Sequence, residues 1–157
     1  MQSLPGLRFE RGMALLASLL FLSLLTMIGV SAMQNATLQE RMAASLAQQQ
    51  RAFEAAETAL RLGEAQVRKG ISWPVCATPV QCAPPGESSW VVDAGWNAIS
   101  GVRWVATVDG YYAVQNLGLV KGAVRLPEEV TATLYRVTAI GLAGQARSVL
   151  ESIYAKY

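Results

Sequence analysis

The chain has 157 residues, of which 52% are apolar and 15% charged, with 13 Lys and Arg, 11 Asp and Glu, and no histidine. The absence of histidine excludes Ser-His-Asp and Cys-His catalytic sites and removes the commonest metal ligand. A formal net charge of +2 makes nucleic acid an unexpected partner. The sequence also has no Gly-rich phosphate loop and no metal-spaced acid cluster, so we expect no cofactor, no metal and no enzyme activity.

Residues 13–33 form an apolar run without a charged residue or a proline. At the rise of an α-helix such a run is about 30 Å long, which matches the hydrocarbon thickness of a bilayer. We therefore expect it to span a membrane. Arg8 and Arg11 precede the run, so the positive-inside rule places the N-terminus in the cytoplasm and the rest of the chain outside.

Three interpretations of the N-terminus are open. A secretory signal peptide would be cut after the small-x-small site at residues 30–32, although the apolar run is longer than the usual h-region of about 7–15 residues. A plain signal anchor would stay uncut. The third depends on Gly12, because a short basic leader, a glycine and a hydrophobic helix resemble the leader of type IV pilins and type II secretion pseudopilins. That resemblance implies cleavage by prepilin peptidase between Gly12 and Met13, and N-methylation of Met13.

The resemblance has one departure, at the fifth position of the mature chain. Most such pilins carry a glutamate there, which is thought to pair with the terminal ammonium of a neighbouring subunit, whereas this chain has Ala17. An unpaired ammonium inside an apolar bundle is costly, so a subunit without the carboxylate suits a place with no subunit ahead of it. That place is the tip of a filament. The alternative is that Ala17 marks a chain that is no pilin.

Two polar blocks follow the apolar run in order, TLQERMA at residues 37–43 and AFEAAETALR at residues 52–61. With the run itself they resemble the PilX-type minor pilins of Gram-negative type IV pili, a family that also tends to lack the glutamate. The resemblance implies a subunit that waits in the inner membrane with a periplasmic head, primes pilus assembly, and then lies at or near the pilus tip. Its implied partners are other minor pilins, the major pilin, prepilin peptidase and a tip adhesin.

Residues 34–70 are predicted to continue the helix outside the membrane. Helix formers dominate, no proline occurs, and Gly70 and then Pro74 provide an end. Apolar residues at helical spacing form one stripe, which consists of Leu38, Met42, Leu46, Phe53, Ala56, Leu60 and Val67. We expect most of this stripe to pack against the chain's own sheet. Its first part, Leu38 to Leu46, is expected to contact neighbouring stalks in a filament core.

Residues 71–157 are predicted to form a globular head that begins with a loop-rich segment. Cys76 and Cys82 close a short proline-containing loop on the outer side of the membrane, where an isolated pair favours a disulfide over two unpaired thiols. The segment also contains three tryptophans, Trp73, Trp90 and Trp96. We expect them to pack as a small core beneath the loop, the alternative being that they are exposed contact anchors.

Strand patterns occupy the rest of the head. Residues 102–108 and 111–115 flank Asp109-Gly110, which predicts a hairpin with these two residues in the turn. Residues 130–140 and 146–154 form a second predicted hairpin around residues 141–144. Four antiparallel strands packed on one long helix give an α+β, pilin-like fold. We expect the helix to cover one face of this small sheet and partner proteins to contact the other.

Three other functions compete with a minor pilin. The tip pseudopilin of type II secretion also lacks the glutamate by family resemblance, but it usually carries a much larger head than residues 71–157 allow. A single-pass or secreted envelope protein with no filament role is a rival from a different class. A DNA-uptake receptor is disfavoured by the near-neutral charge that follows the apolar run.

Overall fold

The computed structural model describes residues 10–122, 127 and 130–157, with side chains from Met13 onwards. It divides into two units, Met1–Ala44 and Ser45–Tyr157. We call them the stalk and the head and describe each by itself. Three predicted features lie outside the described residues or side chains. They are the basic residues before the apolar run, most of the predicted leader, and the acidic pair at residues 128 and 129.

The stalk consists of the first part of helix α1, which as a whole spans Glu10–Arg68. Every stalk residue from Met13 onwards is exposed, and from this residue on the helix is long and apolar enough to cross a membrane. Hydroxyl groups inside the apolar run bond to the helix itself: Ser18, Ser23 and Thr26 donate to carbonyl oxygens three residues earlier at 2.8–3.0 Å. The apolar run therefore exposes few unsatisfied polar groups to a surrounding lipid phase.

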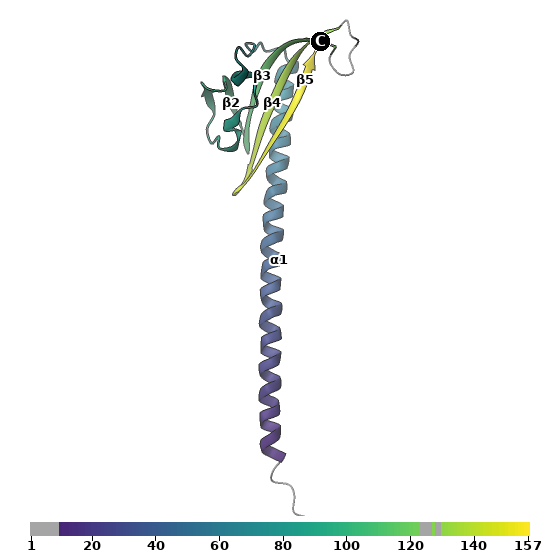
Figure 1. Cartoon of the computed structure of the whole chain (residues 1–157), viewed down its shortest axis with the longest axis vertical. Helices are drawn as coiled ribbons and strands as arrows, with labels where there is room; N and C mark the ends of the chain where they lie inside the picture. Colours follow the sequence, from purple (N-terminus) through teal and green to yellow (C-terminus); the bar gives the residue numbers. More distant parts are fainter. Residues whose placement is uncertain (1–9, 123–126, 128–129) are drawn as a thin grey trace, which may run out of the picture. The chain divides into compact units, whose positions relative to one another are not determined.

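The head contains a five-stranded antiparallel sheet in the order β1-β2-β3-β4-β5 (Figure 1). Its strands are β1 (Gly95–Asn97), β2 (Val102–Thr107), β3 (Gly110–Lys121), β4 (Thr131–Ala143) and β5 (Ala146–Lys156). Two short helices, α2 (Pro79–Cys82) and the 3-10 helix η1 (Gly86–Ser89), precede β1. The α+β, pilin-like fold is thus confirmed, but the expectation of four strands was wrong because β1 has only three residues and no alternating pattern.

Both predicted hairpins form, with their turns displaced by one or more residues. Thr107 pairs with Gly110, so the first turn consists of Val108 and Asp109 and the glycine opens β3. Gly110 lacks a positive φ, and a side chain there would overlap the carbonyl of Ile140 on β4. Close approach of two strands, and not turn geometry, therefore requires this glycine. The second turn has Gly144 at φ 58°, a left-handed conformation suited to glycine.

Small residues mediate the packing of α1 on the sheet. Ala52, Ala56, Ala59 and Val67 are fully buried, and a side chain on Gly63 would overlap Val137 of β4. These helix residues meet one face of the sheet, whose core consists of Tyr112, Val114, Tyr135, Val137 and Ala139. The predicted apolar stripe is therefore correct for its Ala56, Leu60 and Val67 part.

The stripe was wrong for Phe53, which was expected to pack against the sheet and stays 49% exposed. The reason is that the buried line of the helix is shifted toward Ala52 and Ala59, which allow the helix axis to approach the strands more closely than a leucine or phenylalanine would.

The second face of the sheet is covered in part by the chain's own loops, while Val149 and Ile153 on β5 stay 39% and 55% exposed. Val91, Val102, Trp104, Ala113 and Ile140 form a separate cluster there. Arg147 of β5 secures the cover, because its guanidinium donates to the carbonyl oxygens of Ser88 at 3.2 Å and Val91 at 2.7 Å. The expectation that this whole face would be left for partner proteins was therefore wrong.

The expected tryptophan core forms only in part. Trp73 packs edge-on against Tyr135, with 5.9 Å between the ring centroids. Trp90 and Trp96 are instead 67% and 64% exposed, because the segment that carries them runs over the outside of the head. The tryptophan that does occupy the core is Trp104 of β2.

Candidate functional site

The predicted processing and packing residues of the stalk all lie on α1. Gly12 is helical, and Met13 and Ala17 are exposed. No acidic residue occurs between Met13 and Glu40 in the sequence. A chain that begins at Met13 would therefore have no carboxylate near its terminal ammonium from its own stalk. Any neutralising group would have to come from another molecule.

The three residues predicted to contact neighbouring stalks follow at a spacing of four along α1. The side chains of Leu38 and Met42 in the stalk are 53% and 64% exposed, and Leu46, in the head, is as exposed as Met42. Large apolar side chains at such a spacing on one helix are typical of a surface that another helix covers. The structure thus leaves this part of the predicted stripe without an intramolecular partner among the described residues.

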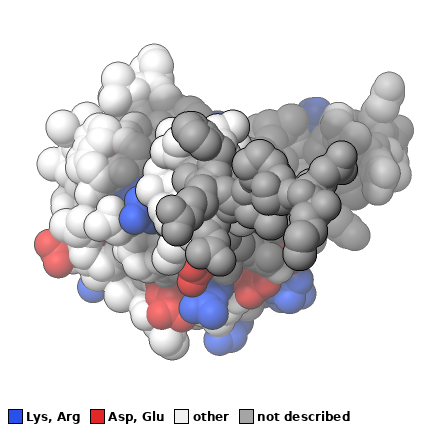
Figure 2. Space-filling view, turned by 90° about the horizontal axis from the view of Figure 1, so that it is seen from below, with Lys and Arg blue, Asp and Glu red and all other residues white. Residues whose placement is uncertain are grey.

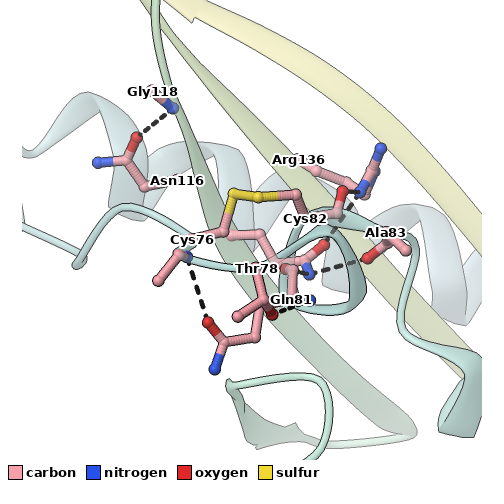
Figure 3. Close-up of a disulfide and its surroundings, with 10 residues drawn as sticks. Cys76, Thr78, Gln81, Cys82, Ala83, Asn116, Gly118 and Arg136 are labelled. Atoms are coloured by element: carbon pink, nitrogen blue, oxygen red, sulfur yellow. Dashed lines mark hydrogen bonds between the residues drawn. A yellow bond between two sulfur atoms is a disulfide. The ribbon is translucent and has the colours of Figure 1, made fainter.

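The predicted disulfide is present between Cys76 and Cys82, whose Cα atoms lie 5.3 Å apart (Figure 3). Thr78 caps helix α2 inside the loop, because its hydroxyl oxygen accepts from the backbone N–H of Gln81 at 3.2 Å. Pro79 at the first helical position suits the fixed φ of proline. Local sequence thus shapes the loop independently of the sulfur bridge.

Side chains from β3 and β4 hold the disulfide loop on the sheet (Figure 3). Gln115 donates to the carbonyl oxygens of Gln81 at 2.6 Å and Ala83 at 3.0 Å, and Arg136 donates to that of Cys82 at 2.7 Å. On the other side of the loop, the N–H of Cys76 donates to the carbonyl oxygen of Asn116 at 2.9 Å. The loop is therefore an integrated part of the head.

A buried carboxylate in η1, just after the disulfide loop, bonds η1 to residues near and on β2. Glu87 in η1 is 5% exposed and accepts hydrogen bonds from the Ser100 hydroxyl and, at 3.2 Å, from the indole N–H of Trp104. Two donors compensate its desolvation in part. We interpret Glu87 as a structural residue. Among the described residues, no group of three His, Cys, Asp or Glu side chains could hold a metal ion.

Charged side chains of both signs are mixed on the face of the molecule that Figure 2 shows. In Figure 2 they gather along the lower edge of the view, whereas a large area at the upper left has none. Mixed signs create no extended positive field of the kind that attracts a polyanion. On this face, binding of a partner would therefore depend on apolar contacts and on a few specific polar contacts.

Sequence reasoning missed one part of the head. Trp96 was expected in a core and Arg103 was treated only as a strand residue. The structure places them opposite each other on β1 and β2, beside two cavities. The signal was weak, because β1 is too short to be recognised from its pattern.

Comparison with known proteins matches part of the helix to a family model. Residues 11–61 match the family model described as PilX N-terminal. The matched segment contains Met13, Ala17, the stripe from Leu38 to Leu46 and both polar blocks. No curated protein and no solved structure matches the chain.

Proposed function

We propose, on the premise that residues 11–61 match the PilX N-terminal family model, that the chain is a minor pilin that primes pilus assembly and lies at or near the pilus tip. The observation that carries the proposal is the matched helix itself, with an exposed apolar stalk and an alanine at the fifth position after Gly12. The role is structural, through contacts with other minor pilins and the major pilin.

Processing is the first step of this function. Prepilin peptidase cuts between Gly12 and Met13, and the new amine of Met13 is methylated. The apolar run then holds the subunit in the inner membrane with its head in the periplasm, as its length and composition allow. Cleavage removes Arg8, Glu10 and Arg11, so the mature stalk begins without a charged side chain.

Position in the filament follows from Ala17. A subunit in the middle of a filament presents a carboxylate to the ammonium of the subunit ahead, and this chain has none to present. Burying that ammonium unpaired would cost several kcal/mol, so addition of this chain beneath another subunit is disfavoured. At the tip no subunit lies ahead and the cost does not arise.

Contacts with partner stalks are assigned to Leu38, Met42 and Leu46. Their exposure supports this assignment, because a helix pays for exposed apolar side chains in water unless another surface covers them. The complex formed with other minor pilins would template addition of the major subunit and can carry a tip adhesin.

The deciding experiment is to determine the mature N-terminus by mass spectrometry of protein from membranes and from sheared surface fibres. N-methylated Met13 in both fractions is the expected result. A start at Met33 would identify an ordinary signal peptide, and an uncut Met1 would identify a plain anchor, and either would overturn the proposal. The Gly12→Val variant is the control, since it should remain uncut and should abolish piliation.

Processing alone does not separate a minor pilin from a type II secretion tip pseudopilin. Recovery with the major pilin in sheared fibres does, because a pseudopilin would require the secretion system for its assembly. Loss of surface pili in a strain without the chain, with secretion intact, is the expected result.

A further inference from the structure

The head has an open edge at which an exposed aromatic and an exposed cation lie side by side. Strand β1 ends the sheet and pairs only with β2 among the described residues. Trp96 on β1 is the direct partner of Arg103 on β2. Side chains of directly paired residues project to the same face of an antiparallel sheet, so the indole and the guanidinium are neighbours.

Arg103 lies between two cavities of about 560 and about 280 Å³. Both are lined by Trp73, Arg103 and Val114, so they adjoin each other, and we call the two together the Arg103 cleft. Ile71 and Val105 add apolar surface on one side, and Trp96 borders the other. Each of these three side chains is at least 38% exposed, so a ligand could contact them.

Charge in the cleft is confined to one residue. Arg103 is the only charged residue that lines either cavity, and within the described part of the chain it has neither an ion pair nor a hydrogen-bond acceptor. A guanidinium presents five N–H donors in a planar fork that matches a carboxylate. The cleft therefore complements a ligand with one anionic group and an apolar body.

Three polar side chains of the smaller cavity are already bonded within the head. Asn116 donates to the carbonyl oxygen of Trp73 at 2.9 Å and accepts from the N–H of Gly118 at 2.9 Å. Gln115 bonds to the disulfide loop and to Arg136, and the Ser100 hydroxyl bonds to Glu87. A sugar, which needs several free amides and hydroxyls, would find few. An apolar segment needs none.

We propose that the Arg103 cleft binds an extended segment of a partner protein in which an aspartate or glutamate is flanked by apolar residues. The segment lies in the cleft, where its carboxylate pairs with Arg103 and its apolar side chains contact Trp73, Trp96 and Val105. The inference concerns the head alone and goes beyond the proposed place of the subunit in a pilus.

The experiment is a titration of the full-length chain in detergent micelles, followed by its tryptophan fluorescence. The probe is the peptide Val-Thr-Asp-Thr-Leu-Thr-Val, blocked at both ends so that its only charge is the aspartate. Its matched partner has asparagine in place of aspartate, and micelles alone are the blank. The aspartate peptide should bind more tightly by about tenfold, as a charge-assisted hydrogen bond predicts.

Variants locate the interaction. Arg103→Gln should abolish the preference for the aspartate peptide, and Trp96→Ala should weaken both peptides; both positions are exposed, so the fold should persist. Arg51→Gln removes the same charge from an exposed position outside the cleft and should leave both affinities unchanged. Equal loss in Arg51→Gln, or no binding of the aspartate peptide, would overturn the proposal. So would binding of glucuronic acid in its place, which would identify a site for acidic sugars.

Discussion

Gly141 of β4 lies directly against the backbone of Ala56 on α1, with no space for a side chain between them. A methyl group on Gly141 would overlap the amide nitrogen of Ala56 and the carbonyl oxygen of Ala52. Because backbone atoms cannot move aside by changing a rotamer, we expect Gly141→Ala to destabilise the head by about 3 kcal/mol. Thermal unfolding followed by circular dichroism in detergent measures the effect as a lower Tm.

Gly86→Ala is the matched control for that substitution. Gly86 lacks a positive φ, and an added methyl group would have no atom within 4 Å. Its Tm should stay at that of the unmodified chain. Similar losses in the two variants would show that glycine replacement in general, and not contact between helix and strand, weakens the head.

Much of the fold could be predicted because it depends on local patterns. The end of α1 is one example: the helix stops at Arg68, and Gly70 takes a φ of 80°. The disulfide is another. The line of helix residues that faces the sheet could be predicted only in part. Large apolar residues at heptad spacing suggested Phe53, whereas close packing selects Ala52 and Ala59 beside the predicted Ala56. Whether a residue is small enough to face the sheet depends on the distance between helix and sheet. No local sequence pattern gives that distance.

The candidate functional residues also fall into a group that the sequence predicts and a group that it does not. Met13, Ala17 and the stripe from Leu38 are positions counted from one glycine on one helix, so the sequence is enough to name them. The Arg103 cleft depends on the register between β1 and β2 and on a loop that leaves their edge uncovered. Such long-range pairing is set by the whole head, and a three-residue strand leaves no periodic signal.

Reduction of the Cys76–Cys82 bond should weaken the head moderately. The bridge closes a loop with a sequence separation of 6, and chain entropy gives such a loop about 2 kcal/mol of stabilisation. The hydrogen bonds from Gln115 and Arg136 do not involve sulfur, so the reduced head should stay folded with a lower Tm. Unfolding with and without dithiothreitol measures the difference.

A double variant, Cys76→Ser with Cys82→Ser, provides the control. Its Tm should match that of the reduced chain and should not respond to dithiothreitol. A reduced chain that loses its circular dichroism signal at room temperature would contradict the view that side chains of β3 and β4 hold the loop in place.

Removal of the buried carboxylate should cost more than removal of an exposed one. Glu87→Ala would leave the Ser100 hydroxyl and the Trp104 indole N–H buried without their acceptor, so we expect a loss of about 2–3 kcal/mol. Glu57→Ala, which breaks the exposed ion pair with Arg61, should change stability by less than about 0.5 kcal/mol. Urea unfolding of both variants, with Trp104 among the fluorescent probes, tests the contrast.

Ala17→Glu should change where the subunit is found in the filament. The new carboxylate would lie at the fifth mature position, where it can pair with the terminal ammonium of the subunit ahead, so this chain could then be added below the tip. One acidic residue raises the cost of membrane insertion by a few kcal/mol, which a long apolar run tolerates. Mass spectrometry of sheared fibres should show a several-fold rise in its ratio to the major pilin. Ala17→Gln, similar in size but uncharged, should show no rise. A ratio for Ala17→Glu no higher than that of the unmodified chain would count against the tip argument, because the missing carboxylate would then not be what excludes this subunit from the rest of the filament.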